Sequence, residues 1–484
     1  MTTDTTAFSI PVIKQFLRLL RLHSKAIFNL FDRQIDPFVN LIRLRIVDAG
    51  IEVEVQPEDS HVAKAVYAFM TDTFRSITIE SSDELPPEFL ESLADEIKYA
   101  LVNDPQFKDR MFFDTDIVEL DNWSTMALVD INAKVYSAHH QLSGNQDGIP
   151  RSLLDAVSHE YHRDINKFIH QFGREDYAKT LNFQDTVRKG AKQLLKLLGY
   201  AGLWDTTFDK LNKISSLNYE GKAIRGHILF THRDHLVSDE GHPNLDVQMV
   251  FSSKIPLSNY RHVRKLLELS RGDIALLSDS EAIYGLGKLR GNYDLEREDL
   301  FSLEFTSYYT WELSHGDKKL MRVSHEQVYM PKDKISYDEF YEAARKIFPD
   351  IPSGNVRELY ILTMKAIDQN RGTLLVVAPD AQHEAKRLKN QCFQVTPIKL
   401  SPDIMQSIIS IDGAILIDME GVCHGIGAIL DGMASRRGDA SRGARYNSAV
   451  RYVETIASLE DRKDPMAIVI SDDGLVDIIT KHEI

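Results

Sequence analysis

The sequence predicts a mixed α/β protein, with a mainly helical amino-terminal region followed by two related parts that are each a mixed sheet flanked by helices. Three observations support this class. The 484 residues are enough for about three domains. From about residue 222 the spacing of apolar residues changes from a helical period towards a period of two. Two glycine-opened strand patterns, starting at Gly226 and Gly372, then repeat one order of elements.

Residues 1–215 carry mostly helical patterns. Near the amino terminus, basic residues recur every three or four positions and leave an apolar stripe made of Ile13, Phe16, Leu17, Leu20 and Ile27. Such a stripe predicts an amphipathic helix that packs on its own protein or on a partner subunit. A short extended piece is expected over 44–57, helices over 86–101 and 152–172, and a strand-like stretch over 125–138.

Residues 222–332 and 345–484 form the two related parts. Strand patterns cover 226–232, 245–253, 273–279, 282–287, 300–313 and 320–330 in the first part, and 372–379, 413–418, 422–430, 467–473 and 475–480 in the second. The segment 226–234 matches 372–380, Ile274 matches Ala414, and the pair Gly285 and Gly287 matches Gly425 and Gly427. A glycine pair within a strand indicates close approach of another backbone.

The charge and the cysteine content restrict the class of protein. A net charge of −15 argues against a protein whose main role is to coat nucleic acid or an anionic membrane. The two cysteines, Cys392 and Cys423, are too few for a disulfide framework, which favours a reducing, cytoplasmic location. No apolar run reaches the ~20 residues of a membrane span, and no signal peptide is expected.

Several motifs that resemble known sites lack a necessary feature. His159 and His162 are spaced i, i+3, whereas a zinc-protease helix needs i, i+4, so we expect a solvated helix face. His232 and His235 have no third ligand nearby in the sequence, so we expect loop or strand-edge residues. The sequence contains neither a phosphate-binding P-loop nor a nucleophile elbow.

The segment from Asp412 to Asp473 carries the strongest signal for chemistry. Asp412 opens a predicted strand, and the small residues Gly413 and Ala414 leave room for a ligand against the backbone. The loop that follows carries the arginines Arg436, Arg437, Arg442 and Arg445. The helix after it has an apolar stripe of Val450, Val453 and Ile456 that predicts a buried face. Its amino terminus would direct free N–H groups and a positive dipole at this loop.

One carboxylate, clustered guanidinium groups and a helix amino terminus are what nucleotidyl transfer requires. The carboxylate activates a hydroxyl or holds a divalent metal, and the cations stabilise a pyrophosphate leaving group. The alternative is a solvated, charged loop beside a strand-end aspartate.

The same segment resembles the diadenylate cyclase (DAC) domain family, whose members condense two ATP into cyclic di-AMP and two pyrophosphates. The family pattern has a glycine-opened strand, an Asp-Gly-Ala triplet, a Gly-Thr-Arg-His-Arg segment that opens a helix, and a late strand ending in Val-Ser-Glu-Glu. The corresponding residues are 372–377, 412–414, 443–449 and 470–473. The resemblance covers roughly residues 350–484 and implies a DAC-type mixed sheet flanked by helices.

The resemblance implies catalytic roles for Asp412 and Arg445, and Asp412, Asp472 and Asp473 as ligands of Mn²⁺ or Mg²⁺. The chain departs from the family in the Gly-Thr-Arg-His-Arg segment, where Tyr446 and Asn447 replace the histidine and the last arginine. Other arginines of the loop and the Ser441 hydroxyl would then compensate. The expected ATP-binding residues are Gly413, Ala414, Arg436, Arg437, Ser441, Arg442, Gly443, Tyr446, Asn447 and Ser448.

Residues 222–332 have Gly272, Asp273 and Ile274 in place of the triplet, and an acidic loop over 291–299 in place of the arginines. This part therefore resembles a degenerate DAC-like sensor domain, and we expect it to bind a small molecule whose identity the sequence does not give.

The resemblance therefore implies a diadenylate cyclase that is regulated by its amino-terminal sensor region, with residues 1–215 also regulatory. It would work as a homodimer or larger homo-oligomer with facing catalytic domains, without stable nucleic-acid binding. Two alternatives stay open. One is a degenerate DAC-like domain that senses ATP or a cyclic dinucleotide without turnover. The other is an enzyme that forms a different cyclic or linear nucleotide.

Overall fold

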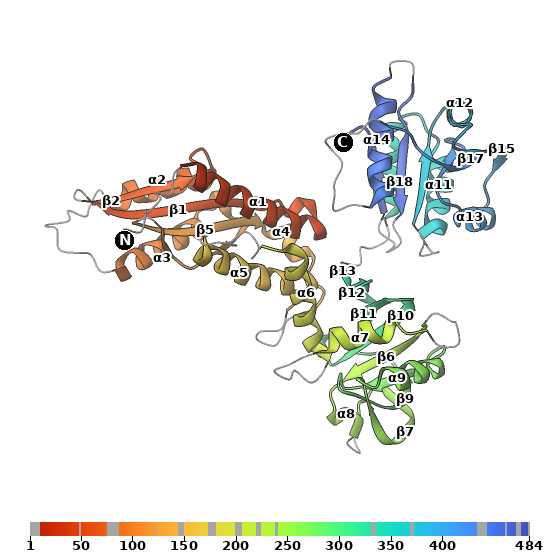
Figure 1. The fold of residues 1–484 in the computed structure, drawn as a ribbon, viewed down its shortest axis with the longest axis horizontal. Helices are drawn as coiled ribbons and strands as arrows, with labels where there is room; N and C mark the ends of the chain where they lie inside the picture. The colour runs from red at the N-terminus through yellow and green to blue at the C-terminus, as the bar shows by residue number, and fades with distance from the viewer. Residues whose placement is uncertain are drawn as a thin grey trace, which may run out of the picture. The chain divides into compact units, whose positions relative to one another are not determined.

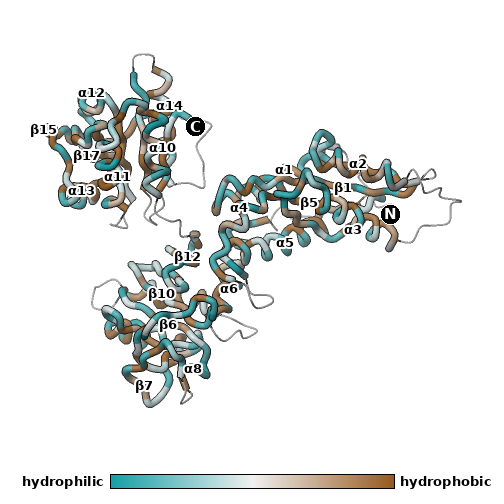
Figure 2. The backbone as a smooth tube through the Cα atoms, turned by 180° about the vertical axis from the view of Figure 1, so that it is seen from behind, coloured by the Kyte–Doolittle hydropathy of each residue, from teal (hydrophilic) through white to brown (hydrophobic). Residues whose placement is uncertain are grey.

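A computed structural model describes residues 10–47, 50–74, 87–120, 122–143, 150–172, 181–198, 206–218, 224–237, 241–330, 335–367, 372–432, 443–459, 462–470 and 476–482. The chain forms two compact units, residues 1–330 and 331–484 (Figure 1). The first unit contains two sheets and the second contains one. Figure 2 shows hydrophobic residues along the central strands, with hydrophilic residues on the outer turns of the helices.

The amino-terminal sheet of the first unit is antiparallel, with the order β2-β1-β5-β3 and with β4 paired to β5. Its strands are β1 (Phe38–Val47), β2 (Gly50–Gln56), β3 (Arg110–Asp114), β4 (Val118–Leu120) and β5 (Trp123–Asn132). The helices α2 (His61–Phe74) and α3 (Pro87–Asn103) pack on one face of this sheet. The helices α1 (Ile10–Phe31) and α5 (Leu153–Gln171) pack on the other face.

The apolar stripe predicted near the amino terminus is buried in α1, where Leu20 and Ile27 have no exposed surface. The helix therefore packs on its own chain. No helix among the described residues has the length and apolar content that a membrane crossing requires. The strands β3 and β4 are not predicted from the sequence, because they are too short to show a period of two. The expected strand over 125–138 ends at Asn132, whose side chain accepts the N–H groups of Lys134 and Val135 and starts α4 (Ala133–Ala138).

The second sheet of the first unit has the order β13-β12-β11-β10-β6-β8-β9-β7. Its strands are β6 (Gly226–Thr231), β7 (Leu245–Pro256), β8 (Ala275–Ser278), β9 (Ala282–Leu289), β10 (Leu300–Ser307), β11 (Thr310–His315), β12 (Lys318–Ser324) and β13 (Gln327–Tyr329). The helices are α6 (Phe183–Leu194), α7 (Thr207–Ser215), α8 (Asp234–Val237) and α9 (Tyr260–Leu266). The core of this sheet is continuous with that of the amino-terminal sheet through α5, α6 and α7.

The second unit is one sheet with the order β15-β17-β16-β14-β18-β19. Its strands are β14 (Thr373–Val377), β15 (Phe393–Lys399), β16 (Ala414–Ile417), β17 (Val422–Ala428), β18 (Met466–Ile470) and β19 (Val476–Ile479). The helices α10 (Tyr337–Ile347), α11 (Ser353–Ile367) and α13 (Pro402–Ile408) cover one face. The helices α12 (Ala381–Arg387) and α14 (Ala444–Ala457) cover the other.

The predicted repeat is confirmed by the topology of the two mixed sheets. The strand order β7-β9-β8-β6-β10-β11 of the first unit equals the order β15-β17-β16-β14-β18-β19 of the second. In both sheets the pair at the centre is parallel, β6 with β8 and β14 with β16, and its neighbours are antiparallel. Gly285 and Gly425 also correspond, because they lie opposite Leu277 and Leu416 in the same strand pair.

The predicted repeat is wrong by one residue in each of the two parallel strands. Ile228 pairs with Leu276, and Leu375 pairs with Ile415, so Ile228 corresponds to Leu375 rather than to Leu374 once the second strands are aligned as follows. Asp279 and Asp418 each follow the second parallel strand and accept two backbone N–H groups of the next turn. This equates Ala275, rather than Ile274, with Ala414. The turn of the second unit is one residue longer, so the shift cannot be read from the glycine spacing alone. Asp273 consequently takes the position of Asp412.

Candidate active site

Asp412 lies between α13 and β16, at the amino-terminal end of a central parallel strand. Its side chain is 98% exposed, and its Oδ1 accepts the N–H of Gly413 at 3.0 Å. Gly413 has φ +100, and a Cβ on it would lie 2.6 Å from the carbonyl carbon of Gly427. Only glycine fits this crossing of two backbones, and the crossing holds the Asp412 carboxylate in solvent.

The two small residues of the triplet do not leave the space that the sequence analysis expected for a ligand. The backbone of Gly427 and Ala428 fills the space beside Gly413. The side chain of Ala414 is fully buried and packs in the core beneath α12 and α14. A ligand can therefore approach the Asp412 carboxylate but not the side chain of Ala414.

The amino terminus of α14 lies beside Asp412. Gly443 is its N-cap and has no side chain to accept the N–H groups of the first turn. Arg445 follows in that turn, and its Nη2 lies 3.8 Å from Asp412 Oδ1. A carboxylate, a guanidinium and the positive end of a helix dipole thus meet at one edge of the sheet. This arrangement can bind a phosphate while it holds a carboxylate next to it.

The remaining predicted residues divide into two groups. Tyr446, Asn447 and Ser448 continue the first turns of α14 and are half-buried, and Tyr446 packs against the core. The residues Arg436, Arg437, Ser441, Arg442, Asp472 and Asp473 lie outside the described residues. The structure therefore brings together Asp412, Gly413, Gly443 and Arg445, and their predicted roles stay predictions.

The hydrophobic face of α14 fixes its position on the sheet. The predicted stripe of Val450, Val453 and Ile456 is buried against β14, β16 and β18. Burial of one such side chain contributes roughly 1.5–3 kcal/mol. This packing determines where the first turn of the helix ends up relative to Asp412.

A group of ion pairs that the sequence analysis missed lies at the opposite edge of the sheet, where β14 ends. Arg387 pairs with the buried Glu384 at 2.6 Å and with Asp431 at 2.5 Å, and Arg462 pairs with Asp380 at 3.0 Å. The hydrogen bonds from Arg387 lower the pKa of the Asp431 carboxyl. These ion pairs connect α12 to its neighbours. The i, i+3 spacing of Glu384 and Arg387 was the available signal.

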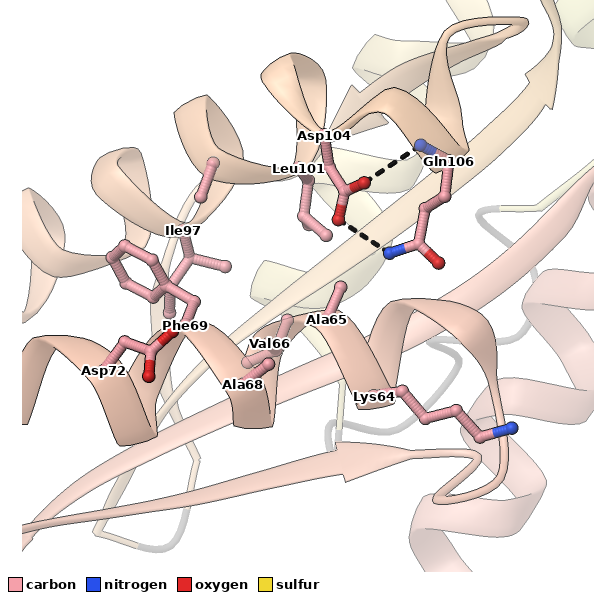
Figure 3. A pocket seen from close by; sticks show the side chains of 11 residues that line it. Lys64, Ala65, Val66, Ala68, Phe69, Asp72, Ile97, Leu101, Asp104 and Gln106 are labelled. Atoms are coloured by element: carbon pink, nitrogen blue, oxygen red, sulfur yellow. Dashed lines mark hydrogen bonds between the residues drawn. The ribbon is translucent and has the colours of Figure 1, made fainter.

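A cavity of about 330 Å³ lies between α2 and α3 (Figure 3). Apolar side chains, among them Phe69, Ile97 and Leu101, form its wall. At its rim the Asp104 carboxylate accepts the backbone N–H and the side-chain amide of Gln106. All the lining residues belong to the first unit, so this cavity is not part of the Asp412 site.

Comparison with protein families identifies two parts of the chain. Residues 363–484 match the DAC domain, described as "DisA bacterial checkpoint controller nucleotide-binding". Residues 205–317 match the domain described as "Probable sensor domain DACNH". Comparison with curated proteins gave no match.

Two solved structures are similar to part of the chain. One is a double mutant of DacA from Staphylococcus aureus, with 17% identity over 25% of this chain and 81% of that chain and a TM-score of 0.21. The other is a hypothetical membrane spanning protein from Bacillus cereus, with 20% identity over 25% of this chain and 60% of that chain and a TM-score of 0.19.

Proposed function

We propose that this protein, with a DAC domain over residues 363–484 and a DACNH domain over residues 205–317, is a diadenylate cyclase under the control of its amino-terminal region. The observation that carries the proposal is the meeting of Asp412, Arg445 and the amino terminus of α14 at one edge of the DAC sheet. A domain that only binds nucleotide has little use for a carboxylate beside a triphosphate, because the like charges repel.

In the proposed reaction each DAC domain binds one ATP, and two domains face each other. The 3′-hydroxyl oxygen of one ATP attacks the α-phosphorus of the other, and its proton passes to the Asp412 carboxylate. The new O–P bond replaces the bond between the α-phosphorus and the oxygen that bridges to the β-phosphate, so pyrophosphate leaves. In the second, equivalent step, the 3′-hydroxyl of the other ATP attacks the remaining α-phosphorus. A second pyrophosphate leaves, and the ring of cyclic di-AMP closes.

Arg445 and the first N–H groups of α14 have a separate task. They face the place where negative charge collects on the departing pyrophosphate, and they stabilise it by charge-assisted hydrogen bonds. One domain presents one ATP and cannot close the ring alone. The active species is therefore at least a homodimer.

The donor chemistry at this edge suits a hard divalent cation. The exposed Asp412 carboxylate is the type of oxygen ligand that Mg²⁺ and Mn²⁺ take together with phosphate oxygens, and Asp472 or Asp473 would add a second carboxylate. When bound, such an ion neutralises charge on the triphosphate.

The test is to incubate the purified full chain with ATP and Mn²⁺ or Mg²⁺ and to resolve the products by mass spectrometry. We expect cyclic di-AMP and pyrophosphate in a ratio of one to two. Formation of a different cyclic or linear nucleotide would mean that the protein is an enzyme with a different product. ATP that binds and stays intact with either metal would contradict the proposal.

A second candidate function is a nucleotide sensor without turnover. It is favoured by Tyr446 and Asn447, which stand where the family pattern has a histidine and an arginine. Fewer cations at the phosphates weaken the stabilisation of a leaving pyrophosphate more than they weaken binding. Tight ATP binding without product is the result that this alternative predicts.

A further inference from the structure

Two histidines and an aspartate from distant parts of the chain meet in the domain that matches DACNH. His235 lies on α8, His242 precedes β7, and Asp299 immediately precedes β10. One ligand-type atom from each of the three lies within 4.8 Å of the other two. His242 has no exposed side-chain surface, and the Asp299 side chain is 17% exposed.

The expectation that His235 lacks a third ligand was therefore wrong. The antiparallel pairing of β6 with β10 places Leu300 opposite Thr231. This pairing brings Asp299 to the end of β6, from which α8 follows at once. A contact over this separation along the chain cannot be read from sequence spacing.

The hydrogen bonds of His235 place its ring proton on Nδ1, which leaves Nε2 able to bind a metal. The hydroxyl of Thr231 donates its one proton to the carbonyl oxygen of Asp299 at 2.8 Å. At its other contact, with His235 Nδ1 at 2.9 Å, this hydroxyl can only accept, so Nδ1 carries the proton. The Nε2 atom then keeps its lone pair. A ligating histidine commonly donates its second ring N–H to an oxygen in this way.

The Asp299 carboxylate is also held in place by two residues outside the group of three. The guanidinium of Arg297 donates to Oδ2 at 2.8 and 3.1 Å, and the hydroxyl of Tyr293 donates to Oδ1 at 3.1 Å. Oriented carboxylates of this kind are typical of metal sites, where the surrounding partners fix the ligand. His242 Nε2 lies 3.1 Å from Oδ1. This separation is close to that of two ligands at about 2.0–2.1 Å from one tetrahedral zinc ion.

We propose that this domain binds a divalent transition-metal ion through one ring nitrogen each of His235 and His242 and one carboxylate oxygen of Asp299. Two neutral imidazoles and one carboxylate favour ions of the Zn²⁺ and Co²⁺ type over Mg²⁺ or Ca²⁺, which prefer oxygen ligands alone. This is not the proposed cyclase metal site. The cluster lies at the end of β6, whereas Asp273, the counterpart of Asp412, lies at the start of β8, and these parallel strands place the two positions at opposite edges.

Metal binding would change both hydrogen bonds of the His242 ring. Without an ion, the N–H of Asn244 donates to His242 Nδ1 at 3.0 Å, so the ring proton is on Nε2 and is donated to Asp299. An ion at Nε2 takes the place of this proton, which moves to Nδ1, and the bond from Asn244 is lost. The side chain of Asn244 also donates to the carbonyl oxygens of Arg290 and Asn292. Binding of a metal ion is thereby coupled to the conformation of the turn that leads into β7.

The corresponding place in the DAC domain supports a difference in role. There, the end of β14 and the chain before β18 carry the ion pairs of Arg462 with Asp380 and Glu384. The nitrogen atoms in those pairs belong to a guanidinium, which donates hydrogen bonds and has no lone pair for a metal. The DACNH-matched domain has imidazoles where the DAC domain has ion pairs between guanidinium groups and carboxylates.

The test uses the full chain without an affinity tag and stripped of metal. Zn²⁺ is titrated calorimetrically, Co²⁺ is followed by its visible absorption, and Mg²⁺ serves as the probe expected not to bind at this site. We expect one equivalent of Zn²⁺ or Co²⁺ to bind. The variant His235→Ala should bind at least about tenfold more weakly, because even the loss of a partner behind a ligand costs about 10–100-fold.

The matched control is His232→Ala. His232 is exposed and its ring centre lies 6.3 Å from that of His235, but it is not part of the three-residue group. We expect it to bind as the wild type does, and hydrogen exchange at the Asn244 amide to become faster when Zn²⁺ is added to the wild type. Thermal unfolding checks that each variant folds, and His242→Gln replaces any variant that does not.

Two results would overturn the metal site: no Zn²⁺ or Co²⁺ binding by the wild type, or equal losses in His235→Ala and His232→Ala. Neither result depends on cyclase activity, so the proposed function stands or falls separately.

Discussion

At the scale of single residues, the Asp412 carboxylate is positioned by the glycines beside it, together with its contacts to the N–H of Gly413 and to Arg445. Gly413 and Gly427 both have positive φ, and their backbones lie against each other. The carboxylate is thereby held in solvent next to Arg445 while the following residues enter the buried strand β16. The Asp-Gly-Ala triplet thus has a structural role, whatever the outcome for its proposed chemistry.

Gly413→Ala should destabilise the second unit by about 2–4 kcal/mol, because a Cβ at this φ is strained and overlaps the backbone of Gly427. The measurement is chemical denaturation of the full chain, followed through the transition of the second unit, together with product formation. The matched control is Gly354→Ala, because no atom lies within 4 Å of a Cβ at Gly354. Equal stability and activity of the two variants would contradict this reading of Gly413.

At the scale of elements, α14 joins the core to the candidate site. Its apolar stripe is buried against the sheet, and its first turn presents Arg445 beside Asp412. The sequence was sufficient to predict this helix, its buried face and the neighbouring strand, because each follows from local spacing of apolar residues and glycines.

What the sequence could not provide were contacts set by strand pairing between distant segments. The meeting of His235 with Asp299 depends on the register of β6 against β10. The packing of Gly413 against Gly427 depends on how β16 and β17 pair, with an irregular register between them. Local patterns carry no information on such registers, so these contacts needed the structure.

Arg445→Ala should weaken ATP binding by about 10–100-fold, since a hydrogen bond to a charged group contributes about 1.5–3 kcal/mol. Titration of the full chain with ATP measures this. The control is Arg357→Ala, which removes an exposed arginine from α11 on the opposite face of the same sheet and should leave ATP affinity unchanged. Unchanged ATP binding in Arg445→Ala would contradict a role of this helix in phosphate binding.

If the three loop arginines Arg436, Arg437 and Arg442 compensate for the departures from the family pattern, their joint replacement by alanine should weaken ATP binding as much as Arg445→Ala does.

At the scale of the whole molecule, one strand order occurs twice with different polar residues. The copy in the second unit has Asp412, Gly413 and the arginine on α14. The copy in the first unit has Asp273 followed by Ile274 at the same place, and it gathers its polar side chains around Asp299 at the other edge. We therefore expect the first unit to regulate the reaction rather than take part in it.

A fragment that begins at residue 331 should fold and form product at high protein concentration, without the control exerted by the first unit. It keeps α10, whose residues Phe340 and Ala344 are fully buried in the core of the second unit, whereas a cut at residue 345 would remove them. Sedimentation shows whether the fragment dimerises, and mass spectrometry detects the product. A folded, dimeric fragment without any activity, beside an active full chain, would mean that the first unit contributes catalytic groups.

The most direct test of the central claim compares the full chain with its Asp412→Asn variant for ATP binding and for product formation under the same metal. Asparagine has the same shape and can keep the contact with the N–H of Gly413, so ATP should still bind. The amide cannot take the proton of the 3′-hydroxyl, so cyclic di-AMP formation should fall by about 10²–10⁴-fold. Equal rates of product formation by the two proteins would contradict the assignment of Asp412 as the catalytic carboxylate.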